Sequence, residues 1–373
     1  MKKNRIEIVG TSGLPHHYGG FEQLANQLTI HLNQVFSFIV YTPRENRKNN
    51  IKTVNGATLC FIPFKSNGIQ SILYDISSMV HALFFCDIIF VCGVSGCLFF
   101  PVIKLFRKPI ILNPDGNEWK RNKWSSLAKV FLKWSEKAGI GFSDVIVSDN
   151  AVIRDYIKRV RKKDSVLIQY GGDHVIKTIL QNDTKIKYNI KQNGYAFNVC
   201  RIEPENNIHL ILEAFKNIPE MDILIVGNWN YSSYGKNLRL EFSKYQNIKM
   251  LDSIYDQVAL DELRSNCGIY IHGHSVGGTN PSLVEAMCLG CFIIAFDVSY
   301  NIVTTDHKAL YFKSTNDLMT ILKKYSAHEI DVTEHQKNLL EVGNTLYKWK
   351  DISEKYASVF DCFRIGVKSG IND

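Results

Sequence analysis

Short apolar runs alternate with longer amphipathic stretches along the whole chain. In its first half the apolar runs predict strands at Ile6–Val9, Ser37–Tyr41, Thr58–Ile62, Ile88–Cys92, Ile110–Asn113, Val145–Ser148 and Val166–Gln169. Apolar positions at helical spacing between them predict helices at about Phe21–Leu32, Ile69–Phe84, Leu98–Phe106, Ser125–Gly139 and Ala151–Lys158. Because the strands look buried on both faces, they are typical of a parallel sheet covered by helices.

A second series of the same kind begins after "NDTKIKYNIKQNGY". Its predicted strands are Tyr195–Cys200, Asp222–Val226, Ile248–Leu251, Gly268–His272 and Phe292–Phe296, separated by helices at His209–Phe215, Gln257–Ser265 and Pro281–Leu289. The closing stretch "LYKWKDISEKYASVFDCF" predicts one more amphipathic helix. We therefore expect an α/β protein with two doubly wound, Rossmann-like domains, at residues 1–175 and 176–350, and a C-terminal helix within 351–373.

Composition supports this division and limits the function classes. A chain of 373 residues exceeds the usual size of one core, and 45% hydrophobic with 21% charged residues is an ordinary globular composition. The net charge of +8 favours anionic partners. The most apolar run, at 88–103, is too short and too interrupted for a spanning helix, and no secretory signal is visible, so we expect a cytoplasmic protein, soluble or attached to a surface from outside.

The nine cysteines are odd in number and scattered, which favours reduced, buried thiols over a disulfide framework. Cys288 and Cys291 form a C-x-x-C pair, but no second pair stands at zinc-ligand spacing. We therefore expect small buried side chains there and no metal. His272 and His274 offer only two ligands and are interpreted as hydrogen-bonding loop residues.

The first strand is followed by an unusually long loop, Gly10 to Gly20. Gly19 and Gly20 stand directly before the predicted helix, where backbone N–H groups can approach an anion, so the pair is a candidate phosphate cradle; a simple turn is the alternative. Neither G-x-x-x-x-G-K-[ST] nor G-x-G-x-x-G is present. A P-loop enzyme and an ordinary nicotinamide dehydrogenase are therefore disfavoured.

The second half repeats this chemistry. Arg201 directly follows a strand, where it can clamp a phosphate or pair with a neighbouring glutamate. Further on, "YIHGHSVGGTNPSLVEAMCLGC" gives a strand, a glycine turn and a helix start with Pro281 in its first turn. Glu285 lies one turn into that helix, within plausible reach of a ribose hydroxyl pair. Two phosphate-suited helix starts and an arginine suggest a ligand with a nucleoside diphosphate.

The stretch "NPDGNEWKRNKWS" at 113–125 follows another strand. Asp115 comes directly after the strand end, and charged residues there interleave with Trp119 and Trp124, a pattern suited to sugar and phosphate recognition. The alternative is a helix start with buried tryptophans. We interpret Asp115 as a catalytic residue, or as one that orients the acceptor, the molecule to which a sugar would be transferred. Binding of that acceptor is also assigned to His17, Tyr18, Glu118, Trp119 and Arg121.

Five motifs in order make the chain resemble the retaining glycosyltransferases of family 4, which have the GT-B fold, and in particular the rhamnosyltransferase-like branch of bacterial polysaccharide assembly. The motifs are "GTSGLPHHYGGFE", "NPDGNEWKRNKWS", "CRIEPENN", "HSVGGTNPSLVEAM" and "YKWKDISEKY". The resemblance implies two domains facing a cleft, with the N-terminal domain on the acceptor side, the C-terminal domain on the donor side and the last helix crossing back to the first domain.

The same resemblance implies site roles. Gly19, Gly20 and Arg201 would contact the donor's diphosphate, Arg201 as a catalytic residue, and Glu285 would hold the ribose. The turn would meet the diphosphate or the sugar through Gly278, Thr279, Asn280 and Ser282. Asn206, also taken as donor-binding, replaces a lysine usual in the family, and Gly277 replaces a glutamate usual eight positions before the ribose-binding one. Both departures suit the rhamnosyltransferase-like branch but leave the donor sugar open.

The expected reaction is transfer of a sugar, best assigned as L-rhamnose from dTDP-rhamnose, to a glycan or lipid-linked acceptor of bacterial surface polysaccharide. No cofactor is expected, and because no D-x-D motif occurs, no metal. The alternatives are a sugar-nucleotide epimerase of the same fold and a non-catalytic membrane-surface protein. The basic tract at 158–163 either binds acidic headgroups or is a solvated helix end, so peripheral membrane contact is open; nucleic-acid binding is not expected.

Overall fold

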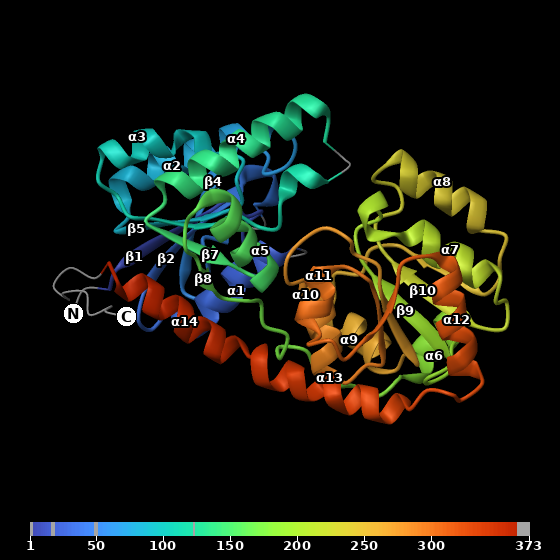
Figure 1. The fold of residues 1–373 in the computed structure, drawn as a ribbon. Coiled ribbons are helices and arrows are strands. Elements are labelled where there is room, and N and C mark those ends of the chain that lie inside the picture. Colours follow the sequence, from blue (N-terminus) through green and yellow to red (C-terminus); the bar gives the residue numbers. More distant parts are fainter. Residues whose placement is uncertain (1–2, 16–18, 48–50, 122–123, 364–373) are drawn as a thin grey trace. The chain divides into compact units, whose positions relative to one another are not determined.

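The chain forms two compact units in a computed structural model that describes residues 3–15, 19–47, 51–121 and 124–363. The first unit comprises residues 1–120, 124–170 and 349–373, and the second comprises 121–123 and 171–348 (Figure 1). The chain thus enters the second unit at Gly171 and returns to the first at Trp349.

The first unit is built on one eight-stranded sheet. Its strand order is β3-β4-β2-β1-β5-β6-β7-β8, parallel except for the short β3, which is antiparallel to β4. The strands are β1 (Arg5–Val9), β2 (Ser37–Pro43), β3 (Thr53–Val54), β4 (Ala57–Ile62), β5 (Ile88–Cys92), β6 (Ile110–Asn113), β7 (Val145–Ser148) and β8 (Val166–Leu167). Successive connections run outward in opposite directions from β1 and β5, so the sheet is doubly wound with its switch point between these two strands.

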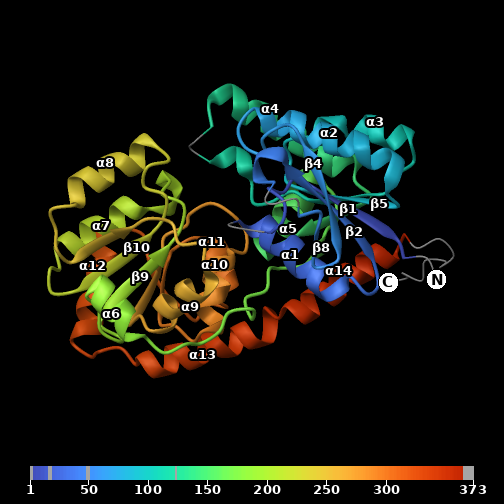
Figure 2. The ribbon, with the colours of Figure 1, turned by 180° about the vertical axis from the view of Figure 1, so that it is seen from behind.

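Helices cover both faces of this sheet (Figures 1 and 2). One face carries α2 (Gln70–Phe85), α3 (Phe100–Leu105) and α4 (Ser126–Phe142), and the other carries α1 (Gly20–Leu32) and α14 (Trp349–Asp361). Because side chains alternate along a strand, Ile6 and Ile8 join the core beneath α1 and α14. Glu7 points to the opposite face, where it accepts a hydrogen bond from Tyr41, which also contacts His81 of α2. The smaller elements are η1 (Arg44–Asn46), η2 (Cys97–Phe99), η3 (Glu118–Lys120), α5 (Ala151–Tyr156) and the π-helical turn η4 (Ile157–Arg161).

The second unit has a six-stranded parallel sheet of order β11-β10-β9-β12-β13-β14. Its strands are β9 (Tyr195–Val199), β10 (Asp222–Val226), β11 (Ile248–Leu251), β12 (Ile269–His272), β13 (Ile293–Phe296) and β14 (Leu310–Phe312). This order is that of a Rossmann fold, with the switch point between β9 and β12. One core lies against α7 (Ile208–Lys216), α8 (Ser233–Phe242) and α12 (Thr315–Ser326). The other lies against α9 (Gln257–Ser265), α10 (Pro281–Cys288) and α13 (Val332–Leu346).

The predicted fold class, two doubly wound α/β units, is confirmed. Ile88–Cys92, Ile110–Asn113 and Asp222–Val226 are strands with the predicted bounds. Several elements were missed: β3, β14, α8, α11 (Ser299–Thr304), α12, α13 and α6 (Asn182–Tyr188), the last within the stretch "NDTKIKYNIKQNGY" that precedes the second series. For α12 a signal was present, because Ser314 and Asp317 form a capping box at its start. Within the described ranges, no helix has the length and apolar character needed to cross a bilayer.

Candidate functional site

In the second unit, the sheet's switch point brings together two segments that are far apart in the sequence. β9 and β12 are neighbours, and the loops after them meet at the carboxyl edge of the sheet. Ser275 donates two hydrogen bonds to the carbonyl oxygen of Glu205, from N at 2.9 Å and from Oγ at 2.8 Å. Asn207 Nδ2 donates to the carbonyl oxygen of Gly273 at 2.8 Å. The Arg201 loop and the glycine turn therefore form one continuous surface.

Arg201 stands at this edge with its side chain exposed. Its Nε lies 3.9 Å from Glu203 Oε2, and 43% of the side-chain surface of Arg201 is exposed to solvent. Asn206 is buried, and its Nδ2 donates to the carbonyl oxygen of Arg201 at 2.6 Å. This placement favours a role for Asn206 in holding the turn that presents Arg201, rather than a role in contacting a ligand.

The glycine turn leads into α10 through a side-chain cap. Asn280 Oδ1 accepts hydrogen bonds from Ser282 N at 3.1 Å and from Ser282 Oγ at 2.8 Å. Gly277, before the turn, has φ of 145°, a conformation that side chains rarely adopt. Because Asn280 already satisfies the Ser282 N–H, an anion at this turn would meet the backbone at Gly278 and Thr279 first. The side chains of Asn280 and Ser282 are thus hydrogen-bonded to each other at the start of α10.

Glu285 is held inside a chain of charged side chains. Its Oε1 lies 3.3 Å from His174 Nε2, and its Oε2 lies 2.8 Å from Arg264 NH2. Arg264, on α9, is 1% exposed, and its NH1 lies 3.6 Å from Asp261 Oδ1. Burial by itself favours the neutral carboxyl, but Arg264 and His174 outweigh it and lower the pKa of Glu285 below its ordinary value. Glu285 is therefore a fixed carboxylate at neutral pH.

Sequence reasoning missed the partners of Glu285. His174 follows "GGD" at the entry to the second unit, and Arg264 looks like any helical arginine in "DELRSNC". Neither position shows a periodic or spacing signal, because the contact joins three segments that only the fold brings together. Arg264 and His174 hold the carboxylate in place and favour its ionised form.

His272 and His274 stack with ring centroids 4.4 Å apart. The prediction that both are hydrogen-bonding residues is wrong for His272, because among the described residues neither of its ring nitrogens has a hydrogen-bond partner. Burial lowers the pKa of His272 to about 3, so the ring is neutral. The neighbouring hollow is lined by His274, Val276, Gly277, Gly278, Asn280, Tyr300 and Asn301. No cluster of three possible metal ligands occurs in the part of the chain that the structure describes.

In the first unit, the loop after β1 begins at that sheet's own switch point. The helix α1 starts at Gly20, one residue before the predicted start. Gly19 has φ of 123°, and a Cβ at this position would lie 1.9 Å from Glu22 Oε2. Glu22 Oε1 also accepts from Ser12 N at 2.5 Å. A carboxylate of the protein itself thus lies at the helix start where a phosphate was expected, a competitor that the sequence analysis overlooked. His17 and Tyr18 lie outside the described residues.

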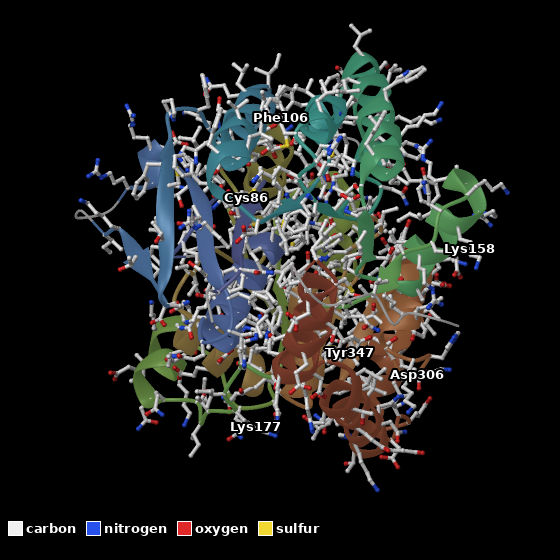
Figure 3. All side chains as sticks on the ribbon, turned by 90° about the vertical axis from the view of Figure 1, so that its left-hand side faces the viewer. Cys86, Phe106, Lys158, Lys177, Asp306 and Tyr347 are labelled. Carbon is white, nitrogen blue, oxygen red and sulfur yellow. The ribbon has the colours of Figure 1, made fainter. Side chains whose placement is uncertain are left out.

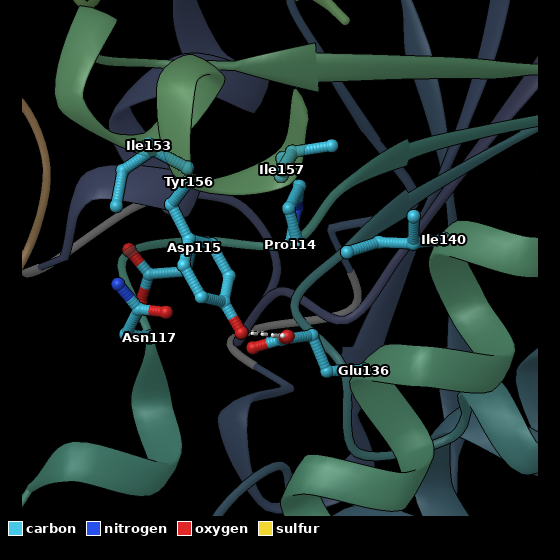
Figure 4. Close-up of a pocket in the computed structure, with 8 residues that line it drawn as sticks. All are labelled: Pro114, Asp115, Asn117, Glu136, Ile140, Ile153, Tyr156 and Ile157. Atoms are coloured by element: carbon cyan, nitrogen blue, oxygen red, sulfur yellow. Dashed lines mark hydrogen bonds between the residues drawn. The ribbon is translucent and has the colours of Figure 1, made fainter. Parts of the chain in front are cut away.

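Asp115 occupies a constrained position after β6. Its φ is 63° and that of Asn117 is 46°, both in the left-handed region that ordinary residues avoid. Asp115 N donates to Asn113 Oδ1 at 3.2 Å, which closes the turn. Figure 4 shows Asp115 and Asn117 lining a hollow beside the ring of Tyr156.

Glu136 of α4 fastens this loop to the rest of the unit. Its carboxylate accepts from Trp119 Nε1 at 2.8 Å, from Tyr156 OH at 2.8 Å (Figure 4) and from Arg161 NH2 at 2.6 Å. The Trp119 indole is therefore anchored by its N–H. Its ring faces Lys133, whose Nζ lies 5.2 Å from the ring centroid. Glu136 is thus a second buried acid, and no motif or spacing in the sequence singles it out.

The other predicted acceptor residues lie nearby in the sequence but differ in placement. Glu118 is half-buried, and its Oε1 accepts from Trp124 Nε1 at 3.0 Å. Arg121 is 7% exposed and groups with the second unit. The first unit therefore presents Asp115, Glu118 and Trp119 on one anchored loop.

Comparison with protein families assigns each half of the chain separately. Residues 181–324 match the model described as "Glycosyl transferases group 1", and residues 3–173 match "Domain of unknown function (DUF1972)". No curated protein sequence matches this chain.

Solved structures of similar fold extend over nearly the whole chain. Sucrose-phosphate synthase from Thermosynechococcus elongatus is 16% identical with a TM-score of 0.79, over 96% of this chain and 99% of that one. HepE from Anabaena, in complex with UDP and glucose, is 13% identical with a TM-score of 0.76, over 96% and 100%. A putative UDP-N-acetylglucosamine 2-epimerase from Listeria monocytogenes is 10% identical with a TM-score of 0.62, over 98% of each.

These likenesses show the GT-B fold that the sequence resemblance implied. Together with the group 1 domain of the second unit, they support a glycosyltransferase of the GT-B class. Family 4 and its rhamnosyltransferase branch are a narrower assignment and belong to the proposal below.

Proposed function

We propose that this protein is a retaining glycosyltransferase of family 4 that moves a sugar from a nucleoside diphosphate to a glycan or lipid-linked acceptor in bacterial surface polysaccharide synthesis. The observation that carries the proposal is the carboxyl edge of the second sheet. There, the exposed Arg201 follows β9, and the capped glycine turn follows the neighbouring strand β12. The fixed carboxylate of Glu285 lies one helical turn beyond that glycine turn. This is where doubly wound sheets bind ligands.

In this proposal each group has a separate task. Arg201 and the backbone of Gly278 and Thr279 bind the diphosphate and neutralise the charge that grows on it as the glycosidic bond breaks. Glu285, ionised because Arg264 and His174 lower its pKa, accepts hydrogen bonds from the ribose hydroxyls. No metal is needed for these tasks.

For the first unit we propose acceptor binding. Asp115 orients the acceptor hydroxyl, and Glu118 and Trp119 contact the sugar that carries it. The constrained backbone at Asp115 and the anchoring of Trp119 by Glu136 favour this role, since a functional loop held in an unusual conformation requires such support. We retain Gly19 and Gly20 as donor contacts; Glu22 must then move or share the helix start with the phosphate.

The donor we favour is dTDP-rhamnose. Gly277 stands where the wider family has a glutamate for the transferred sugar, and Asn206 replaces a lysine; both changes fit the rhamnosyltransferase-like branch. The alternative is an epimerase, because the fold is shared with the putative 2-epimerase above. An epimerase would convert its nucleotide sugar without any acceptor.

The test is a thermal-shift panel of dTDP-, UDP- and GDP-sugars, followed by transfer assays on lipid diphosphate acceptors. We expect one donor to stabilise the protein and to be consumed only with acceptor. Arg201→Ala should abolish the shift. Arg239→Ala should retain it, because Arg239 is a half-buried arginine of α8 paired with Asp252 at 2.6 Å, away from the proposed donor contacts. The proposal fails if no nucleotide sugar stabilises or is turned over, and acceptor-free conversion would establish the epimerase.

A further inference from the structure

The first unit has one helical face that is apolar on its outer side as well as its inner side. Large apolar side chains are exposed on α2, η2, α3 and α4 and just after α3. We call these the apolar face: Leu73, Val80, Phe84, Phe85, Leu98, Val102, Leu105, Phe106, Leu127, Val130 and Trp134. Many large apolar side chains exposed on neighbouring helices mark an interaction site, because their exposure to water is unfavourable.

The spacing shows that the apolar face is built along each helix. On α2, Leu73, Val80 and Phe84 are seven and four residues apart, so they share one side. On α4, Leu127, Val130 and Trp134 are three and four apart. Phe84 is 72% exposed and Leu127 is 85% exposed, so these side chains project outward and do not complete the core. Figures 1 and 2 show α2, α3 and α4 together on the same side of the sheet.

The exposed charges on α2, η2, α3 and α4 are of one sign. Lys129, Lys133 and Lys137 lie four residues apart on α4, and Lys104 lies on α3, where it is paired with Asp144 at 2.6 Å. Among the described residues of α2, η2, α3 and α4, the carboxylates are Asp75 and Glu136, which are 2% and 3% exposed and engaged internally. The surface therefore combines exposed apolar side chains with the three lysines of α4, which form no ion pair among the described residues.

We propose that the apolar face docks the protein onto an anionic lipid bilayer, with α2, α3 and α4 against the headgroup region. Apolar side chains enter the boundary of the acyl chains, and lysines meet lipid phosphates. A second copy of the chain fits poorly, because a two-fold contact would set the α4 lysines of one copy against those of the other without a carboxylate between them. Nucleic acid would leave the apolar side chains unused.

The basic tract at 158–163, which the sequence suggested for this task, is less suited. Arg161 is bound to Glu136 at 2.6 Å and its side chain is 12% exposed. Lys158 lies 3.2 Å from Asp164. Figure 3 shows Lys158 well apart from Phe106 of the apolar face. Two of its basic residues are thus paired with carboxylates, and the tract lacks the extended apolar surface of α2, α3 and α4.

The docking surface is continuous with the loop proposed to bind the acceptor. Glu136, on the inner side of α4, accepts from Trp119, and Lys133 on the same helix faces the Trp119 ring. A bilayer against α4 would bring lipid-linked acceptors close to that loop. This consequence rests on the proposed function, whereas the docking itself does not.

The experiment is flotation of the full chain with vesicles of phosphatidylcholine alone or mixed equally with phosphatidylglycerol. We expect binding to the anionic vesicles. Phe84→Ser/Leu105→Ser/Trp134→Ser should weaken it on the order of 100-fold, since three large apolar side chains no longer insert. The matched control is Ile186→Ser/Leu240→Ser/Val258→Ser, which removes equally exposed apolar side chains from the second unit and should change nothing.

A second pair of variants separates the two basic surfaces. Lys129→Gln/Lys137→Gln should weaken binding to anionic vesicles roughly 30-fold, about fivefold for each lysine. Lys162→Gln/Lys163→Gln, in the basic tract, should leave it unchanged. Circular dichroism and light scattering confirm that each variant is folded and reveal its oligomeric state.

Several results would overturn the proposal: no flotation of the wild type, equal losses in the two apolar triples, loss only in the tract variant, or self-association that the Phe84 triple abolishes without vesicle binding. All variants should keep the thermal shift with donor, because none alters a proposed donor contact. Vesicle binding without any donor shift would reject the proposed function alone.

Discussion

The buried pair between Arg264 and Glu285 gives the sharpest prediction about the second unit. Arg264 is 1% exposed, and its NH2 lies 2.8 Å from Glu285 Oε2. Replacing Arg264 with methionine fills similar space but leaves the carboxylate buried with only His174 beside it. Loss of one partner of a buried ion pair costs about 3–5 kcal/mol. The second unit of Arg264→Met should be destabilised by that amount at neutral pH.

The matched control has the same residue type in an exposed pair. Arg239 NH1 lies 2.6 Å from Asp252 Oδ1, but their side chains are 34% and 71% exposed. Arg239→Met should therefore cost less than about 1 kcal/mol. The comparison isolates burial, because the distances in the two pairs are nearly equal.

The pH dependence follows from the direction of the pKa of Glu285. In the wild type this pKa is lowered, so the pair stabilises the fold above the unfolded-state value and loses that effect as the pH falls through the folded-state value. Without Arg264, burial dominates and raises the pKa. Arg264→Met should then be most stable in acid. Its difference from the wild type in free energy of unfolding should shrink as the pH falls below the ordinary pKa of a glutamate.

The assay is native-state hydrogen exchange of peptides from β12 and α10, read by mass spectrometry. Their slowest amides should exchange roughly 100- to 5,000-fold faster in Arg264→Met. The double variant Arg264→Met/Glu285→Gln should recover much of the loss, since no buried charge remains. Equal effects of Arg264→Met and Arg239→Met, or no recovery in the double variant, would refute the reasoning.

Three further predictions concern the first unit. Burial raises the pKa of Asp75 to about 7, so its carboxylate weakens the fold progressively as the pH rises from 3.8 through 7. Asp75→Asn should therefore raise the Tm at pH 8 but not at pH 4, and the gain in free energy of unfolding at pH 8 should be up to roughly 4 kcal/mol. Glu136→Ala should destabilise the unit by about 3 kcal/mol in urea unfolding, because Arg161 loses its buried partner. Gly19→Ala should lower the Tm and weaken the donor's thermal shift, since its Cβ would collide with Glu22.

Each of these has an outcome that contradicts it. A Tm gain of Asp75→Asn that does not depend on pH would show that the carboxylate is not the cause. For Glu136→Ala, the control Glu354→Ala on the exposed side of α14 should be silent, and an equal loss would remove the special role of the buried acid. Gly19→Ala with unchanged Tm would mean that the Glu22 carboxylate moves away at no cost.

Local pattern was sufficient for most of the fold. β5, β6 and β10 could be bounded because buried parallel strands are continuous apolar runs, and the alternation of strands and helices predicts doubly wound sheets. Elements with weak apolar patterns were not predicted: α8 is polar over most of its length, and β14 has only three residues. Such elements are fixed by their packing on a sheet more than by their own sequences.

The residues of the candidate site also fall into those that local pattern predicts and those that only packing reveals. Arg201, Asp115 and the glycine turn could be found because each follows an apolar strand, and strand ends lie at the ligand-binding edge of such sheets. The sequence also determined the fold class, through the period of its apolar residues. Only the tertiary structure decided that Glu285 is paired with Arg264 and His174, that Glu22 lies at the start of α1 and that three helices leave an apolar face outward. The reason is that periodicity records which residues are apolar, whereas charge partners and exposed faces depend on contacts between segments far apart in the chain.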